Sequence, residues 1–209
     1  MPEYQESISL LRGLLTENRV VRPDVPTGNV ALITGPPGSG KSMVRKYGLI
    51  DLQNAKYVAV DTWIELLASE DELGNPEVIG GLHQKYADKF KKHSMDSIAG
   101  GRRDENYIIE LTGGDFESLV GRVNTFKGHG FRVVLVHVEV PLHVALAGNK
   151  ARPRRVPEQH IVKVFQTAKA NFNEVLPMVD EAWVITNWTG EHYPNFKDYR
   201  SSDLIKRVK

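Results

Sequence analysis

The chain has 209 residues, enough for one α/β domain with a substantial core and too few for two domains of ordinary size. Its 41% hydrophobic and 25% charged residues are typical of a globular protein in water, and no stretch is long and apolar enough to span a membrane. The formal net charge of +1 gives no reason to expect tight binding to nucleic acid or to a membrane surface.

The absence of cysteine excludes disulfides and zinc–thiolate sites and fits a reducing compartment. The first residues lack the basic segment and apolar core of a signal peptide, so we expect a cytoplasmic protein. Apolar residues at helical spacing predict an N-terminal helix over residues 7–18, which either packs on the sheet or docks a partner. We divide the chain into a lead-in of residues 1–28, a domain of residues 29–187, and a tail of residues 188–209 that packs on the domain or extends it.

Residues 35–42 match the P-loop pattern, in which Gly, four residues, Gly and Lys precede Ser or Thr. An apolar run over residues 30–34 predicts a buried strand before the loop, and residues 43–52 predict a helix after it. The residues expected to bind nucleotide are Gly35, Pro36, Pro37, Gly38, Ser39, Gly40, Lys41 and Ser42. Lys41 can reach the β- and γ-phosphates and Ser42 can bind Mg²⁺, whereas the alternative of a glycine-rich turn that binds nothing is disfavoured by the preceding strand.

A second apolar run, residues 57–60, ends at Asp61. In open parallel sheets ligands lie beyond the carboxyl ends of the strands, so Asp61 is a candidate to accept a proton from a substrate hydroxyl or to hold a water of the Mg²⁺ shell. The alternative is that Asp61 caps the helix predicted over residues 62–67. Farther on, residues 78–92 predict a helix, and neither His83 nor His93 has a third partner at metal-ligand spacing.

Residues 107–114 predict a third buried strand that ends in polar residues. Glu110 is the informative position, because an acid within an apolar strand is costly unless it is paired or faces a site. It could order the Mg²⁺ shell or bind a substrate hydroxyl. Asp115 then predicts the N-cap of a helix over residues 116–127.

Residues 131–138 are the clearest strand in the sequence, and His137 within it is expected to be a core histidine rather than a ligand. A helix beginning near Pro141, a helix over residues 158–175 and a strand over residues 182–186 follow. The alternation predicts an α/β P-loop NTPase fold, with a doubly wound, mainly parallel sheet of about five strands flanked by helices.

Residues 148–157 carry four positive charges, at Lys150, Arg152, Arg154 and Arg155. Glycine at one end and proline at the other predict a loop. A basic loop that folds over a nucleotide as a short lid would stabilise the charge on a transferring phosphoryl group, and the alternative is a solvated basic loop.

Taken together, the motifs resemble the zeta toxin family of P-loop kinases and the related kinase domain of phage-type polynucleotide kinases. The resemblance covers residues 30–186 and is most specific at residues 60–63, 109–112 and 154–162. It implies ATP-dependent phosphorylation of a nucleotide-sugar hydroxyl, with Asp61 as the base and with Lys41 and Ser42 at the phosphates and Mg²⁺.

The same resemblance implies that Glu110 and Thr112 contact the substrate and that Arg154, or the adjacent Arg155, neutralises the transferring phosphate. Arg152 or Lys150 takes the place of the first arginine of the family's basic segment. This chain departs from the family at residues 113–114, where two glycines replace an arginine, so kinase chemistry carries over better than substrate identity.

The leading hypothesis is therefore a kinase that uses ATP and Mg²⁺ to phosphorylate a hydroxyl of a small molecule. One alternative acceptor is a polynucleotide 5′-hydroxyl, which needs a positive channel and is disfavoured by the net charge. Another alternative is a nucleotide-dependent switch with little turnover, and the zeta resemblance also implies an antitoxin-like protein partner.

Overall fold

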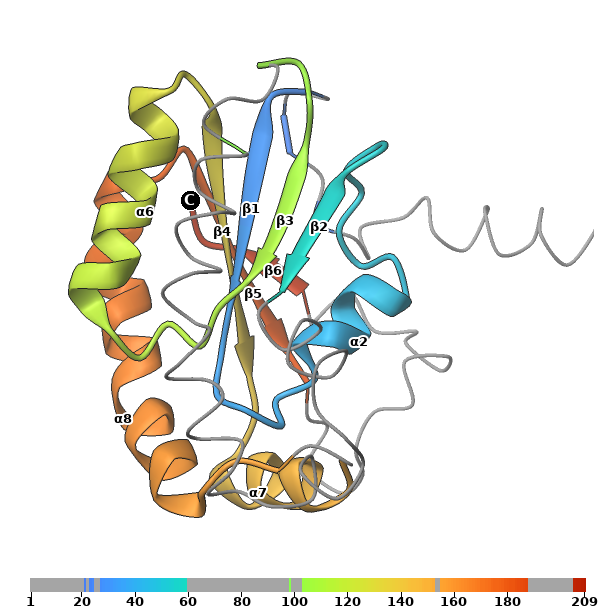
Figure 1. Ribbon diagram of the computed structural model, residues 1–209, viewed down its shortest axis with the longest axis vertical. Coiled ribbons are helices and arrows are strands. Elements are labelled where there is room, and N and C mark those ends of the chain that lie inside the picture. The colour runs from blue at the N-terminus through green and yellow to red at the C-terminus, as the bar shows by residue number, and fades with distance from the viewer. Residues whose placement is uncertain are drawn as a thin grey trace, which may run out of the picture.

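The computed structural model describes residues 21, 23–24, 27–59, 98, 103–152, 155–187 and 205–209. At its centre lies a six-stranded sheet of order β2-β3-β1-β4-β5-β6 (Figure 1). The strands are β1 (Asn29–Thr34), β2 (Lys56–Ala59), β3 (Tyr107–Glu110), β4 (Arg132–Glu139), β5 (Glu181–Thr186) and β6 (Ile205–Arg207). Strands β1 to β5 run parallel, and β6 is antiparallel to β5. The predicted doubly wound sheet is confirmed, with one strand more than the sequence indicated.

Helices cover both faces of this sheet. The described helices are α2 (Lys41–Lys46), α6 (Phe116–Gly128), α7 (Leu142–Lys150) and α8 (Glu158–Val175), followed by a short 3-10 turn at Leu176–Met178. α6 and α8 lie against one face, α2 lies on the other, and α7 lies below the carboxyl ends of the strands (Figure 1). Side chains of β1 alternate between the two cores. Leu32 joins the cluster that includes Leu119 of α6, and Ile33 joins the cluster that includes Val44 of α2.

The capping and periodicity signals of the long helices were read correctly. The side chain of Asp115 accepts a hydrogen bond from the Ser118 backbone N–H at 2.9 Å, as an N-cap does. α8 begins and ends at the expected residues and buries Ile161, Ala168 and Phe172, but Phe165 is only half-buried. These two helices therefore form from local sequence signals and pack their apolar stripes on the sheet.

Three predicted boundaries were wrong. The third strand ends at Glu110 rather than at residue 114. The helix after the P-loop ends at Lys46 rather than near residue 52, because Gly48 adopts a left-handed φ of +63° that an α-helix cannot continue through. The apolar residues beyond it are buried as extended chain, and the Val21 N–H donates to the Leu49 carbonyl at 2.8 Å. The basic segment was expected to be a loop from residue 148, but α7 continues to Lys150.

A clasp at the amino ends of β4 and β5 ties the lead-in and the last strand to the sheet. Arg207 of β6 donates to both carboxylate oxygens of Asp24, at 2.8 and 2.7 Å. The fully buried Glu181 accepts from Arg132 at 3.0 Å and from the Asp24 backbone N–H at 2.9 Å. The clasp is built from charged groups that pair with one another, and the guanidinium groups of Arg132 and Arg207 offset the cost of burying the Glu181 carboxyl group.

Some expectations fall on residues outside the described ranges. These are the N-terminal helix, the segments at 62–67 and 78–92, Asp61, His83, His93 and Arg154. Among the helices that the structure does describe, none is both long and apolar enough to cross a membrane.

His137 is a core histidine, as expected. It is 3% exposed, its Nδ1 lies 3.1 Å from the Thr34 hydroxyl, and its ring packs on Phe172 with ring centres 5.2 Å apart. Burial lowers the pKa of His137 from 6.5 to about 4, and the neighbouring charges of Glu139 and Lys169 act in opposite directions. The imidazole is therefore neutral beneath the P-loop at physiological pH.

This burial predicts a specific pH dependence of stability. Between pH 6.5 and 4 the unfolded chain takes up a proton at His137 that the folded chain does not, so the free energy of unfolding falls as the pH falls, by up to about 3 kcal/mol at this site. We expect His137→Gln to show a smaller loss than the wild type in urea titrations over this range. The exposed His143→Gln controls for removal of an imidazole at the surface. Parallel curves for the wild type and His137→Gln would contradict the prediction.

Candidate functional site

The predicted P-loop connects β1 to α2 at the carboxyl edge of the sheet, so the strand–loop–helix order is confirmed. Gly35, Gly38 and Gly40 have φ angles of +145°, +82° and +88°, which side-chain-bearing residues rarely adopt. Such a backbone lets successive N–H groups point toward one center, which is how a phosphate-binding loop works. Because α2 has only six residues, the loop itself and Lys41 must supply most of the positive potential.

Lys41 lies across the loop. Its ammonium group donates to the carbonyl oxygens of Gly35 at 2.8 Å and Pro36 at 2.9 Å, and its side chain is half-buried. Ser42, the next residue, is exposed in the first turn of α2. Two backbone carbonyls of the loop thus hold the ammonium group of Lys41 against the loop.

The backbone of α7 packs directly against the loop. A Cβ atom placed on Gly38 would lie 2.1 Å from the Ala145 carbonyl oxygen and 2.9 Å from the Asn149 nitrogen. Conversely, a Cβ on Gly148 would lie 2.5 Å from the Gly38 carbonyl oxygen. No side chain fits between these two backbones, so both glycines are required by the contact as well as by loop geometry.

The far side of the loop is held by Asn187, which follows β5. Its side-chain amide donates to the Ser39 carbonyl at 2.8 Å, and its backbone N–H donates to the Glu139 carbonyl at 2.8 Å. Both Asn187 and Ser39 are fully buried. Asn187 was not predicted from the sequence, where its only distinguishing feature is that it is a polar residue directly after a buried strand.

The end of β3 lies beside the loop, as the predicted role of Glu110 requires. Glu110 is half-buried and pairs in register with Ile33 of β1 on one side and with Ala59 of β2 on the other. Two residues on, the Thr112 carbonyl accepts a hydrogen bond from the Gly35 N–H at 3.2 Å. Both residues predicted to contact substrate therefore lie at the P-loop, and Thr112 also braces it through the backbone.

The glycine pair that departs from the zeta pattern is packed closely. Gly113 has a φ of +72°, and a Cβ there would lie 2.9 Å from the Thr34 Cβ. From α8, Asn171 donates to the Gly113 carbonyl at 2.9 Å and Thr167 donates to the Gly114 carbonyl at 3.1 Å. α8 thus fixes the segment that runs from Thr112 to the cap of α6. Neither Thr167 nor Asn171 was predicted from the sequence.

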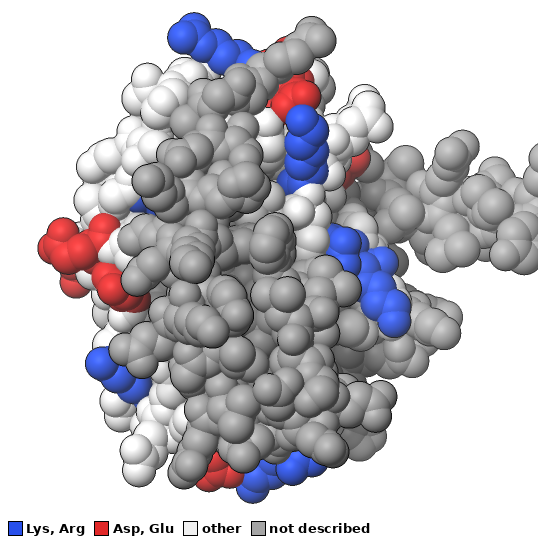
Figure 2. Space-filling model, viewed as in Figure 1, with Lys and Arg blue, Asp and Glu red and all other residues white. Residues whose placement is uncertain are grey.

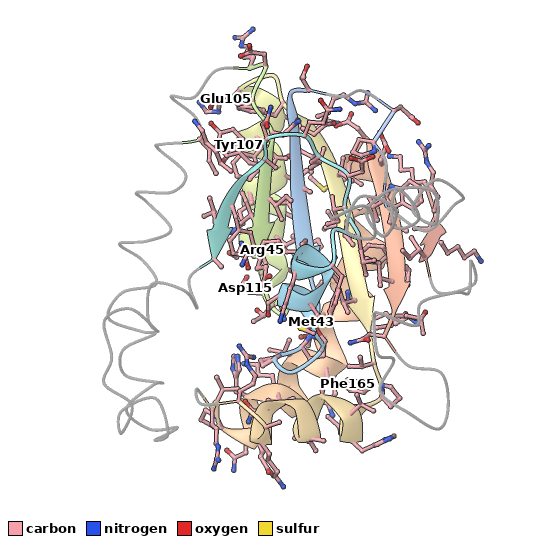
Figure 3. The ribbon with its side chains drawn as sticks, turned by 90° about the vertical axis from the view of Figure 1, so that its right-hand side faces the viewer. Met43, Arg45, Glu105, Tyr107, Asp115 and Phe165 are labelled. Atoms are coloured by element: carbon pink, nitrogen blue, oxygen red, sulfur yellow. The ribbon has the colours of Figure 1, made fainter. Side chains whose placement is uncertain are left out.

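The carboxyl ends of the strands carry different side chains from their amino ends. Figure 3 shows Met43 and Arg45 of α2 together with Asp115 toward the carboxyl end of β3, whereas Glu105 and Tyr107 lie at its amino end. Arg45 is exposed and lies over the Tyr57 ring, 3.9 Å from its centre. The aligned carboxyl ends of the parallel strands thus collect the polar groups of the candidate site.

The predicted basic residues lie between α7 and α8. Arg152 is half-buried, Arg155 is exposed, and Arg154 is outside the described residues. Lys150 forms an exposed ion pair with Glu158 at 3.2 Å. In Figure 2 basic side chains lie over α2 and, beside acidic ones, at the end of the molecule where α7 lies, and others lie at the opposite end. The structure therefore brings Arg152 and Arg155 to the same end of the sheet as the P-loop.

The described residues fit only one way of holding a metal ion. They contain no group of three or more histidines, aspartates or glutamates that could hold an ion by themselves. Mg²⁺ in kinases is bound by one or two protein oxygens together with substrate phosphates and waters. The exposed hydroxyl of Ser42 fits that arrangement.

The site lies within a recognisable family. Residues 30–175 match the family described as an AAA domain. The chain belongs to this AAA domain family. No curated protein sequence matches the chain. The predicted P-loop kinase-like fold is therefore confirmed by a family match that includes the loop, β3 and all of α8.

Solved structures share the fold. One is from the PezAT chromosomal toxin–antitoxin system of Streptococcus pneumoniae, with a TM-score of 0.56 and 15% identity, over 86% of this chain and 76% of that chain. Another is from the Pnkp1/Rnl/Hen1 RNA repair complex, with a TM-score of 0.56 and 20% identity, over 72% of this chain and 47% of that one. A third is AvrRxo1-ORF1:-ORF2 with ATP. It has a TM-score of 0.57 and 14% identity, over 90% of this chain and 64% of that chain.

These likenesses bear on the fold and agree with the resemblance drawn from the motifs, because toxin and RNA repair proteins are among the matches. The chain spans less than two thirds of the matched chain in the RNA repair and AvrRxo1 structures.

The contact between Gly38 and α7 gives a testable prediction. Gly38→Ala combines strain at a φ of +82° with a backbone clash, so we expect it to lower the melting temperature and to weaken binding of an ATP analogue. Gly48→Ala is the matched control, since its φ is +63° but a Cβ there meets nothing within 4 Å. The destabilisation by Gly38→Ala should exceed that of the control by about 1–3 kcal/mol in denaturant titrations. Equal effects of the two substitutions would show that the α7 contact is unimportant.

Proposed function

We propose that the protein is an ATP-dependent phosphotransferase that moves the γ-phosphate to a hydroxyl group of a small molecule. A nucleotide sugar is the leading candidate for the acceptor, in the manner of the zeta toxins. The observation that carries the proposal is the register Ala59–Glu110–Ile33, which aligns the ends of β2 and β3 with the strand that enters the P-loop. Glu110, an acidic side chain at the end of the strand beside the P-loop, supports the proposal because it can bind an acceptor hydroxyl.

The roles of the residues follow from their chemistry. Lys41 neutralises the phosphate oxygens, and the loop N–H groups hold them. Ser42 would hold Mg²⁺, which when bound neutralises charge that develops on the phosphates. Arg152 and Arg155, with Arg154, supply guanidinium groups for the transferring phosphoryl group. Glu110 and Thr112 orient the acceptor.

Asp61 is proposed as the general base. It accepts the proton of the acceptor hydroxyl as the oxygen forms its bond to phosphorus, while the bond from phosphorus to the β-phosphate oxygen breaks and ADP leaves. Ala59, two residues before it in the chain, is the last residue of β2, and β3 lies between β2 and β1. Since neighbouring strands lie about 4.8 Å apart, the ends of β2 and β1 are separated by roughly 10 Å. That spacing leaves room for an acceptor hydroxyl between a base and a γ-phosphate.

The comparisons support two further points. One similar structure belongs to a toxin–antitoxin system and another to an ORF1:ORF2 assembly, which supports an antitoxin-like protein partner. The structure from an RNA repair complex supports keeping a polynucleotide 5′-hydroxyl as the second candidate acceptor.

A panel of acceptors tests the proposal directly. The protein is incubated with ATP, Mg²⁺ and either nucleotide sugars, dinucleotides or 5′-hydroxyl oligonucleotides, and mass spectrometry is used to detect a gain of one phosphate. We expect transfer to a nucleotide sugar, and Lys41→Met should lower it about 100-fold or more. Lys46→Met, which removes an exposed lysine from the same helix, should retain activity. Transfer to none of the acceptors would reject the proposal, and unchanged turnover of Lys41→Met would reject the P-loop assignment.

If Asp61 is the general base, its replacement should impair phosphate transfer but not ATP binding. Asp61→Asn keeps the size of the side chain but cannot accept the proton, so kcat should fall about 100-fold or more while binding of an ATP analogue stays near that of the wild type. Asp51→Asn removes an exposed carboxylate elsewhere and serves as the control. Full activity of Asp61→Asn would exclude Asp61 as the base.

A further inference from the structure

Asn149 closes the connection between α7 and α8. Its side chain donates from Nδ2 to the Val156 carbonyl at 3.0 Å and accepts at Oδ1 from the Val156 N–H at 3.0 Å. Both backbone polar groups of Val156 are thus paired with one amide, which is 3% exposed. The two ends of the segment that carries the arginines are thus joined by two hydrogen bonds from the buried side chain of Asn149 to Val156, which we call the Asn149 bracket.

The bracket rests on the P-loop. The backbone nitrogen of Asn149 lies 2.9 Å from where a Cβ on Gly38 would be, and a Cβ on the preceding Gly148 would lie 2.5 Å from the Gly38 carbonyl oxygen. The residue that closes the basic connection is therefore packed on the backbone that would hold the phosphates. This close backbone contact couples the position of Asn149 to that of the loop.

The ion pair that the described residues form across the same connection is weak. Lys150 and Glu158 pair at 3.2 Å, but their side chains are 69% and 58% exposed. Exposed pairs of this kind contribute little, because water screens them and two long side chains must be ordered. The buried Asn149 bracket, rather than this ion pair, is therefore what fixes the ends of the segment.

We propose that Asn149 is a positioning residue, which holds Arg152 and Arg155 in place relative to the P-loop for action on the transferred phosphate. The inference rests on the proposed phosphotransferase function. Asn149 acts through the arginines and need not touch a substrate. A catalytic group held by a fixed segment loses less conformational freedom in the transition state than one on a free loop.

The isosteric substitution Asn149→Asp tests the hydrogen-bond pattern. As a carboxylate it accepts from the Val156 N–H but cannot donate to the Val156 carbonyl, whereas a protonated carboxyl group restores both bonds. We expect kcat to fall about tenfold or more at pH 8, with KM for ATP little changed. The ratio of its kcat to that of the wild type should rise as the pH is lowered toward 5.5. Asn124→Asp, at an exposed position of α6, is the matched control and should show a flat ratio.

Asn149→Ala removes both hydrogen bonds without adding a charge, so its kcat should be low at every pH, with no recovery. Limited proteolysis gives a second readout that does not depend on activity. Trypsin can cut after Arg154 or Arg155, and cutting of Asn149→Ala should be about tenfold faster or more than that of the wild type, because opening of the connection costs less.

The outcomes separate the inference from the proposed function. An active wild type together with unchanged kcat and unchanged proteolysis of Asn149→Ala would overturn the inference alone. A flat pH ratio for Asn149→Asp would also overturn it, because the bracket predicts recovery on protonation. If the wild type transfers phosphate to no acceptor, the proposed function fails together with the role given to the arginines, whatever the proteolysis shows.

Discussion

The close approach of the P-loop backbone to the backbone of α7 is the constraint on which the rest of the site depends. Gly38 and Gly148 leave no space for a side chain between the two segments, although they are far apart in the sequence. The shape of the loop is therefore fixed by a tertiary contact as well as by its glycines. α7 in turn lies where it does because β4 ends beneath the loop and Pro141 starts the next helix.

Three residues hold the same loop through further hydrogen bonds. Thr112 accepts from its first glycine, Asn187 donates to Ser39, and Lys41 crosses its opening. Thr112 follows β3 by two residues and Asn187 directly follows β5, whereas Lys41 is the first residue of α2. Parallel strands bring their carboxyl ends to one edge, so residues distant in sequence can brace one irregular segment there. The loop keeps a strained, open backbone because its surroundings determine it from every side.

The sequence predicted the elements whose burial is uniform. β1, β4 and β5 are covered on both faces, so they appear as continuous apolar runs and were located to within a residue or so. α8 was located through its regular apolar stripe. The helix after the P-loop was predicted too long because the apolar residues after Gly48 fit a helix but are buried as extended chain beside Val21. β6 was missed because it has three residues, of which only Ile205 is buried.

The residues of the candidate site also fall into two groups, those that the sequence predicted and those that it did not. The P-loop and Glu110 could be predicted because their residue types are unusual in their context, a glycine cluster in one case and an acid in an apolar strand in the other. Asn149, Asn187, Thr167 and Asn171 could not, since an amide or hydroxyl is common on any surface. Their importance lies in bonds to backbone groups that only the folded chain brings near.

The chemistry of these bracing residues has an electrostatic consequence. All four are neutral, and an amide can donate and accept at once, which suits the unpaired carbonyls of irregular segments. A carboxylate in the same positions would offer no donor, and it would oppose the positive potential that Lys41 and the arginines supply. A lysine or arginine could donate, but it would bring a buried charge that needs its own partner. Neutral bracing therefore adds no negative charge at this end of the sheet, where these four residues supply amides and a hydroxyl rather than ion pairs like those of the clasp at the opposite end.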